Sequence, residues 1–358
     1  MKISLGMTLQ PGPWGGGNQF GHSLAAYLRS KGVDVYFDLS PPDLDLILLT
    51  EPRPHLQSSA FTDKEIRAYL ARHTYPTLVM HRINECDERK GTHDVNQILI
   101  NANSCADYTI FISRWLQDLF FRQGLKTPDS TVILNGANST IFHRHDYRPW
   151  NKQEKLRLVT HHWGGLYLKG FDMYVRVDEL VASPAWKERL DFTYIGNLPE
   201  GVHFANATYI PPHSGRALAK LLARHHVYLT ASQYEPAGMH HIEGAMCGLP
   251  LLYRESGGIP EYCQGYGLSF TAANFEQQLQ KMIATYDSWV DRMASYPHTA
   301  EKMCEQYYQV CLQLVDQRDA IIRRRKWRHR ALWLMQQYRG KSEFFRHLLW
   351  RMISRSKA

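Results

Sequence analysis

Two glutamates eight positions apart, Glu235 and Glu243, are the residues with the most evident chemistry in this sequence. Gly238 lies between them, where a turn gives way to helical spacing, so the amides of Met239 and His240 are free at a helix N-terminus. Free amides and the helix dipole together make a pyrophosphate site. In this interpretation Glu243 accepts a hydrogen bond from a ribose hydroxyl, and Glu235 contacts a transferred sugar or stabilises positive charge at its anomeric carbon. Taken alone, two such glutamates are more common on an ordinary surface helix.

The order of the motifs that follow resembles the signature of retaining GT-B glycosyltransferases of family 4. In this chain the signature is E-x7-E, then Cys-Gly-x-Pro at residues 247–250 and Gly-Gly-x-x-Glu at residues 257–261. The resemblance extends over most of the chain, to an Asn-Gly-Ala-Asn segment at 135–138 and to Lys169. It implies transfer with retention from a nucleotide-diphosphate-sugar to a glycan or lipid-linked glycan, by front-face attack and without a metal ion. It also implies that Lys169 binds the donor phosphates and that Lys169 and Glu235 are catalytic.

One position departs from the family pattern. The family has an arginine five residues before the phosphate-binding lysine, and this chain has Gly164 there. The loop around this glycine holds no cation except His161 and His162, which we place at the donor site. We expect one of these histidines, or an arginine from elsewhere in the chain, to supply the missing charge.

The first half of the chain contributes a glycine-rich loop and a strand-end histidine to the expected site. In the family such a loop lies near the donor phosphates and the acceptor, and its residues here are Gly15, Gly16 and Gly17. His81 ends a predicted strand, where the family often has a histidine, and we expect it to face the cleft as a catalytic residue. Arg82 and Glu85 follow it and are candidates for contacting the acceptor, although a solvated charged loop would explain them nearly as well.

Two patterns imitate metal sites. The Asp-Leu-Asp triplet at 43–45 resembles a DxD motif but stands just before a predicted strand. The His-His-x-Glu run at 240–243 lacks the spacing of HExxH and falls over the predicted phosphate site. We therefore expect no metal cofactor. The six cysteines include no CxxC pair, which favours reduced thiols.

Short buried strands alternate with helical segments in both halves of the chain, which predicts an α/β protein with parallel sheets covered by helices. The strands expected in the first half are Ile3–Met7, Val33–Phe37, Leu46–Leu49, Thr77–His81, Tyr108–Ile112 and Thr131–Leu134. A polar stretch at 143–155 separates the halves. We expect a GT-B fold with two Rossmann-like domains facing a cleft. The first, residues 1–147, lies on the acceptor side, and the second, residues 148–317, binds the donor.

The net charge of +8 is concentrated in a third segment, the helical tail at residues 318–358. It holds 13 Lys and Arg against two acids, a net charge of +11, so the remaining residues carry −3. Interleaved aromatics such as Trp327 and Trp350 favour docking on an anionic membrane surface, with packing across both domains as the alternative. The negative body and the lack of a recognition motif argue against nucleic acid as a partner. We expect a cytoplasmic protein with peripheral membrane association.

Two other functions stay open. A non-catalytic protein that binds nucleotide-sugars or glycans could share the fold, because fold does not determine function. The presence of Glu235, Glu243 and Lys169 argues against it, and the glycine at 164 argues slightly for it. Another GT-B enzyme, such as an epimerase, is the second alternative.

Overall fold

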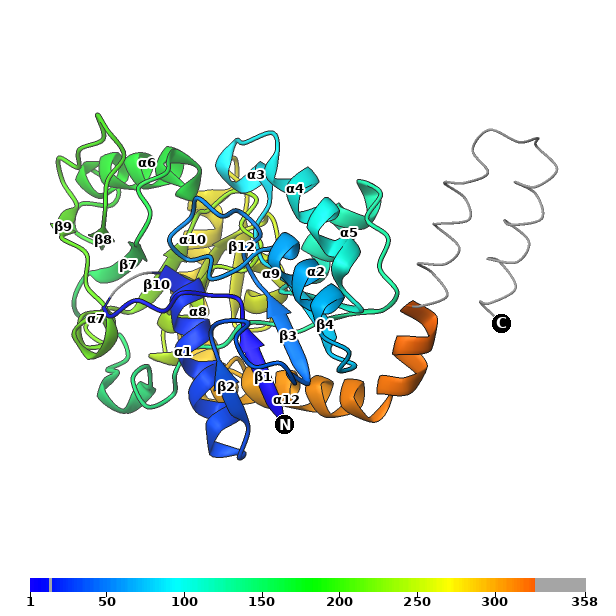
Figure 1. Cartoon of the computed structure of the whole chain (residues 1–358). Coiled ribbons are helices and arrows are strands. Elements are labelled where there is room, and N and C mark those ends of the chain that lie inside the picture. Colours follow the sequence, from blue (N-terminus) through cyan, green and yellow to red (C-terminus); the bar gives the residue numbers. More distant parts are fainter. Residues whose placement is uncertain (13–14, 326–358) are drawn as a thin grey trace.

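The computed structural model describes residues 1–12 and 15–325, which form two α/β domains, each built on a parallel six-stranded sheet (Figure 1). The first sheet has the order β2-β1-β3-β4-β5-β6, with strands β1 Lys2–Leu5, β2 Asp34–Tyr36, β3 Leu46–Leu49, β4 Leu78–Ile83, β5 Tyr108–Phe111 and β6 Ser130–Val132. The second has the order β12-β11-β10-β7-β8-β9, with β7 Leu156–His162, β8 Leu190–Gly196, β9 Thr208–Ile210, β10 Val227–Thr230, β11 Leu251–Arg254 and β12 Gly267–Phe270. The predicted α/β class is confirmed.

Helices cover both sheets. The α-helices are α1 Gly15–Ser30, α2 Asp63–Arg72, α3 Asp87–Lys90, α4 Val95–Ala102, α5 Arg114–Arg122, α6 Phe171–Ala182, α7 Gly215–Leu222, α8 Met239–Met246, α9 Ile259–Cys263, α10 Phe275–Ala284, α11 Tyr286–Arg292 and α12 Ala300–Asp316. Short 3-10 turns lie at Asn103–Cys105, Arg144–Asp146, Tyr167–Lys169 and Met293–Ser295. Strand β3, Leu-Ile-Leu-Leu, is buried along its whole length, as a parallel strand covered by helices on both faces must be.

The strand orders determine where a ligand can bind. In the first sheet the chain moves outward in opposite directions from β1 and β3, and in the second sheet from β7 and β10. At such a switch point the connections leave the carboxyl ends of adjacent strands on opposite faces of the sheet and open a crevice. The segments that follow these strands are α1 in the first domain and the loops after β7 and β10 in the second. The predicted donor-site residues lie at these strand ends: in the last two residues of β7, in the loops that follow β7 and β10, and in α1 and α8.

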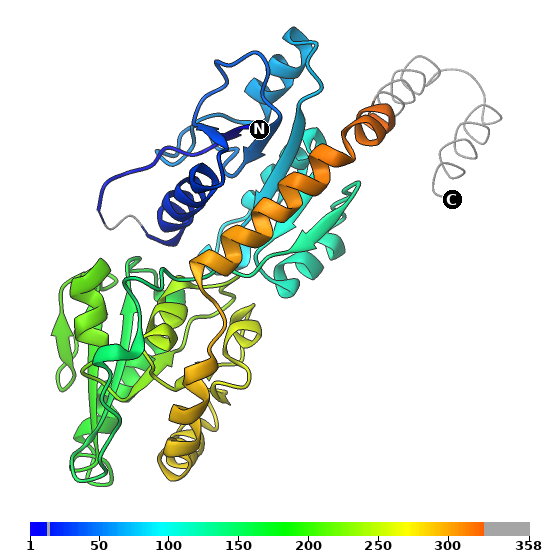
Figure 2. The same ribbon diagram turned by 90° about the horizontal axis from the view of Figure 1, so that it is seen from below.

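Helix α12 returns to the first domain. Figure 2 shows α12 running beside α1 along that domain, away from the sheet that precedes it. Its residues Met303, Tyr307 and Leu314 belong to the same hydrophobic core as Phe20 of α1. The predicted division at residue 317 therefore differs from the packing, because the chain leaves the second domain before α12 begins. The apolar face of α12 explains the difference, since it is buried against α1 and the first sheet.

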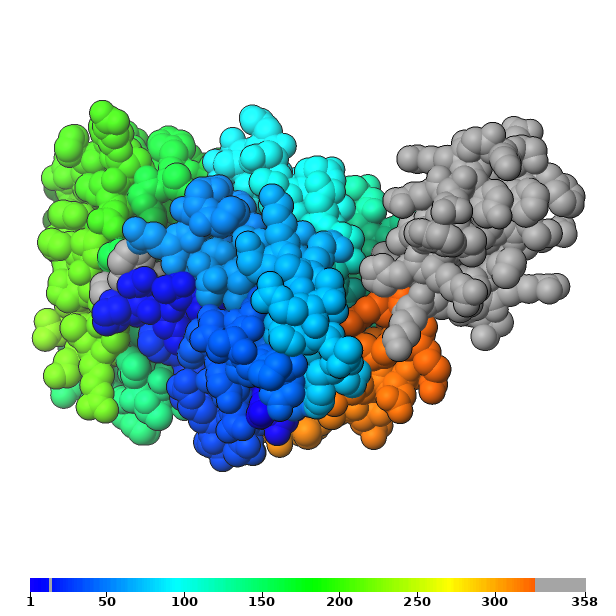
Figure 3. Space-filling view, in the orientation of Figure 1, coloured from blue at the N-terminus to red at the C-terminus, as the bar shows by residue number. Residues whose placement is uncertain are grey.

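The glutamate of the Gly-Gly-x-x-Glu motif and the tyrosine that follows it join the domains. The carboxylate of Glu261 accepts hydrogen bonds from the amides of Arg114 (2.7 Å) and Trp115 (2.8 Å) at the N-terminus of α5. The hydroxyl of Tyr262 accepts one from the amide of Asn135 (3.0 Å). These bonds satisfy amides that a helix N-terminus and the segment after β6 would otherwise leave free. Figure 3 shows the surfaces of the two domains, blue to cyan and green, meeting along a common boundary.

Candidate active site

A cavity of about 440 Å³ lies between the two domains at the carboxyl ends of both sheets. It is lined by thirteen of the fourteen predicted site residues: Gly15, Gly16, Gly17, Arg82, Glu85, His161, His162, Lys169, Glu235, Gly238, Met239, His240 and Glu243. The sequence therefore identified residues that the fold brings together from distant segments. Their roles in binding and catalysis stay predictions.

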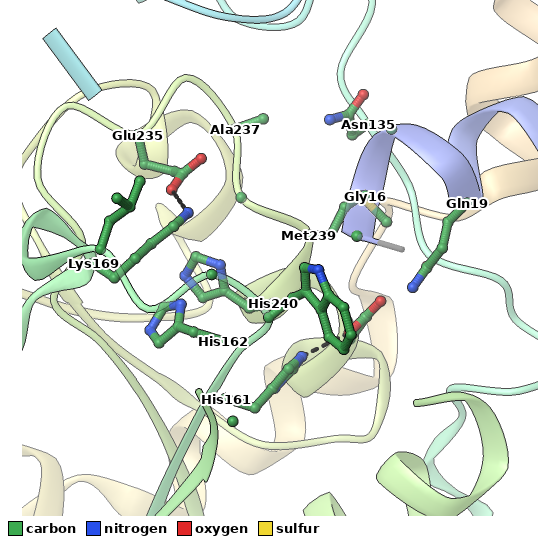
Figure 4. Close-up of a pocket in the computed structure, with 18 of the residues that line it drawn as sticks. Gly16, Gln19, Asn135, His161, His162, Lys169, Glu235, Ala237, Met239 and His240 are labelled. Atoms are coloured by element: carbon green, nitrogen blue, oxygen red, sulfur yellow. Dashed lines mark hydrogen bonds and ion pairs between the residues drawn. The ribbon is translucent and has the colours of Figure 1, made fainter. Parts of the chain in front are cut away.

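Lys169 and Glu235 form an ion pair in the wall of the second domain (Figure 4). The ammonium of Lys169 contacts Oε2 of Glu235, and both side chains are largely buried. Burial raises the pKa of Glu235, but Lys169 and then Arg89 outweigh it and lower the pKa to about 2. Glu235 is consequently an anion at neutral pH, which suits a group that stabilises positive charge but not one that must donate a proton.

Glu243 is held in place by a histidine. Its Oε2 is 2.7 Å from Nε2 of His161, whose Nδ1 is 3.0 Å from the hydroxyl of Tyr228. The other carboxylate oxygen, Oε1, is buried and has no hydrogen-bond partner among the described residues. A buried acceptor without a donor is costly, so this oxygen fits a ligand hydroxyl.

Three further histidines pack beside this pair. The ring centroids of His162 and His240 are 4.4 Å apart, and those of His240 and His241 are 4.9 Å apart. Burial lowers the pKa of all three, with Lys169 contributing in each case, and that of His241 falls to about 3. These rings are therefore neutral at physiological pH. His162 Nε2 and His240 Nε2 bind hydroxyl groups of Tyr174 (2.7 Å) and Thr230 (2.8 Å).

Two helix N-termini meet at the cavity. Gly238, with φ of +74°, precedes α8 and has no side chain that could cap the helix, so the first amides of α8 stay available to an anion. The expected loop at Gly15–Gly17 is instead the first turn of α1. A Cβ atom on Gly16 would lie 2.4 Å from Cγ of Met239, so only glycine lets α1 approach α8 this closely.

The structure adds two cations that sequence reasoning missed. Arg89 and Lys90 lie on α3 of the first domain and line the cavity. Arg89 Nη1 is 3.7 Å from Glu235 Oε1, on the opposite side of the carboxylate from Lys169. The only sequence feature that pointed to these two cations is the charged segment after His81, because α3 is a single turn with no periodicity.

The expectation that His81 faces the cleft is wrong. Strand β4 continues to Ile83, two residues beyond the predicted end, so His81 lies inside the strand and not at its rim. Its side chain is fully buried, with Nδ1 2.9 Å from Oδ1 of Asn103. Burial lowers its pKa to about 4. We assign His81 a structural role.

The two predicted acceptor residues line the cavity but are engaged by the protein. Arg82, which points to the opposite face of β4, donates to Oδ1 of Asn135 (3.0 Å) and lies 3.9 Å from the ring centre of Phe20. Glu85 binds Arg89 and Lys90. Contact with an acceptor stays a prediction for both.

The patterns that imitate metal sites have other uses in the structure. Asp45 accepts from Tyr75 (2.7 Å) and contacts Arg318, and Asp43 pairs with Lys2 (2.7 Å), at the end of the first sheet away from the cavity. In the described part of the chain, no three His, Cys, Asp or Glu residues are grouped so that they could hold a metal ion. All six cysteines are buried and unpaired.

The beginning of the tail packs on the first domain. Arg318 contacts Asp45, and Arg325 contacts Asp107 and donates to the carbonyl of Thr77 (3.0 Å). The aromatic residues on which the membrane hypothesis depends, from Trp327 onward, lie outside the described residues. Among the helices that are described, none is long and apolar enough to cross a membrane.

Several solved structures share the arrangement of the two domains. Sucrose-phosphate synthase from Thermosynechococcus elongatus is similar over 87% of this chain and 98% of its own, with 16% identity and a TM-score of 0.60. A glycosyltransferase from Rickettsia africae matches over 88% and 98%, with 11% identity and a TM-score of 0.63. HepE from Anabaena, in complex with UDP, matches over 87% and 100%, with 15% identity and a TM-score of 0.62.

These similarities establish the fold as GT-B, as the sequence predicted. At such identities they establish the fold alone. Neither a protein-family profile nor a curated protein sequence matches this chain.

Proposed function

We propose that the protein is a retaining glycosyltransferase that uses a nucleotide-diphosphate-sugar donor without a metal ion. The observation that carries the proposal is the pairing of Lys169 with Glu235 beside the free N-terminal amides of α8. Amides and lysine suit the donor diphosphate, and the anionic carboxylate suits the positive charge that develops at the anomeric carbon. The unpartnered Oε1 of Glu243 suits a ribose hydroxyl.

In this mechanism the acceptor hydroxyl attacks from the face that the diphosphate leaves, and the leaving phosphate takes its proton. The protein contributes by holding donor and acceptor together and by stabilising the departing charge. A glycan or lipid-linked glycan is the acceptor that the resemblance to family 4 implies. The first donors to test are uridine-based, because HepE was solved with UDP and with UDP-glucose.

The test is slow donor hydrolysis. Purified protein is incubated with UDP-, GDP- and ADP-sugars, and release of the nucleoside diphosphate is measured. We expect release of the diphosphate from one class of donor, and no release by Glu235→Ala. When an acceptor is added together with an α-linked donor, a retaining enzyme should form an α-linked product. Binding of the diphosphate without any release or transfer would favour the non-catalytic alternative.

A further inference from the structure

Two cations from different domains face one carboxylate in the cavity. Lys169 of the second domain contacts Oε2 of Glu235, and Arg89 Nη1 of the first domain is 3.7 Å from Oε1. A single carboxylate neutralises one of them. With Lys90 and Glu85 included, three cations stand against two carboxylates, which leaves an uncompensated positive charge.

The side chain of Arg89 is oriented by Glu85. Nε of Arg89 donates to Oε1 of Glu85 (3.0 Å) and Nη2 lies 3.3 Å from Oε2, so the carboxylate binds one edge of the guanidinium. This arrangement leaves Nη1 directed toward Glu235. A planar guanidinium with one edge held and the other facing a cavity is prepared to bind a phosphate oxygen.

The two histidines beside Lys169 are not free to bind a phosphate. A Cβ atom on Gly164 would lie 4.0 Å from Cε of Lys169, so the family arginine would have begun beside the lysine, but here there is no side chain. His162 is neutral, and both ring nitrogens of His161 already have partners. The expectation that a histidine replaces the arginine therefore finds no support in the geometry.

We propose that Arg89 binds the donor diphosphate from the first domain while Lys169 binds it from the second. This inference rests on the proposed function and names the residue that replaces the arginine absent at Gly164. The diphosphate takes the place of Glu235 between the two cations, and the released carboxylate turns to the sugar. Because the two cations belong to different domains, a bound diphosphate also holds the domains together.

The experiment measures binding of UDP, GDP, ADP and their nucleosides by calorimetry and ligand-observed NMR. We compare the unaltered protein with Arg89→Gln, Arg89→Lys, Lys169→Met and the control Arg122→Gln, which removes an equal charge from an exposed position of the same domain. In Arg89→Gln we expect the Kd of the preferred diphosphate to rise roughly 10- to 100-fold, with the nucleoside unaffected. Arg89→Lys keeps the charge but loses the planar guanidinium with its paired donors, so its Kd should lie between those of the unaltered protein and Arg89→Gln. Arg122→Gln should bind the diphosphate as the unaltered protein does.

The outcomes separate the two proposals. If the unaltered protein binds none of the diphosphates, the proposed function fails and this inference with it. If Lys169→Met weakens diphosphate binding and Arg89→Gln does not, the function stands and the inference is overturned. Equal loss of diphosphate and nucleoside in Arg89→Gln would also overturn it, because the residue would then support the shape of the cavity and not the phosphates. Thermal unfolding of each variant identifies any that fails to fold, and Arg89→Lys then carries the test.

Discussion

The cavity wall of the second domain consists of side chains that bind one another, whereas the wall of the first domain consists of the glycines of α1 and the charges of α3. In the second domain, Lys169 is paired with Glu235 and His161 with Glu243. These contacts orient the side chains before a ligand arrives, and the diphosphate that we propose then replaces the contact between Lys169 and Glu235. The glycines instead allow close approach of a helix N-terminus. The second-domain wall holds the carboxylates and the lysine of the proposed donor site, and the first-domain wall brings a helix N-terminus and Arg89 close to them.

The largest effect is expected from the second-domain wall. Lys169→Ala removes the charge that we propose binds the donor diphosphate, and kcat should fall roughly 10²- to 10³-fold, the usual loss when one group that stabilises developing charge is removed. The measurement is the rate of diphosphate release at saturating donor. The matched control is Lys126→Ala, at an exposed position of the first domain.

The same variant should fold. Arg89 still faces Glu235 after Lys169 is removed, so the buried carboxylate keeps a counter-charge. Circular dichroism and thermal unfolding check this point. A rate within tenfold of the unaltered protein would contradict the assignment of this wall to the chemical step.

A smaller effect is expected where the walls touch. Gly16→Ala places a Cβ atom 2.4 Å from Cγ of Met239, and Met239 must move or the domains must separate. We expect the donor KM to rise roughly tenfold, since overpacking of this kind costs about 1–3 kcal/mol. Steady-state kinetics with the preferred donor measure the change.

Two matched variants sharpen this test. Gly17→Ala is the control, because a Cβ atom there meets no atom of the described residues within 4 Å. Met239→Ala keeps the backbone amide of α8 but removes the clash, so the double variant with Gly16→Ala should recover most of the affinity. If Gly16→Ala and Gly17→Ala behave alike, close approach of the two helices is not what the glycines provide.

The difference between the walls also explains what could be predicted from the sequence. The second-domain residues follow β7 and β10, and strands that are short, buried and bounded by turns are recognisable locally. The strand order then brings their ends together. The resemblance to family 4 indicates that Lys169 and Glu235, 66 positions apart, belong to one site, and in the structure they are in contact.

Arg89 could not be found this way. It lies on a single helical turn, and its neighbour Glu235 is 146 positions further along the chain, in another domain. Their contact depends on how the domains pack, which no local pattern encodes. The error at His81 has a local cause, because β4 continues two residues beyond the expected end and His81 lies inside it. Side chains of a strand alternate between faces, so the neighbouring Arg82, and not His81, lines the cavity.

The smallest effect on activity is expected at His81. His81→Gln should leave the rate of diphosphate release per folded molecule within about twofold at pH 7.5, whereas loss of a catalytic acid or base costs roughly 10²- to 10⁴-fold. What should change is the dependence of stability on pH. Burial lowers the pKa of His81 to about 4, from an ordinary value near 6.5.

Between these two pKa values the unfolded chain binds a proton at His81 and the folded chain does not. The free energy of unfolding therefore falls as the pH is lowered from about 6.5 to 4, by about 3 kcal/mol for this group. Urea unfolding at pH 7, 5.5 and 4 should show a smaller loss in His81→Gln than in the unaltered protein. The structural assignment is contradicted if both proteins lose the same free energy of unfolding as the pH is lowered and His81→Gln also loses most of its activity. His81 would then be a catalytic acid or base in the first-domain wall.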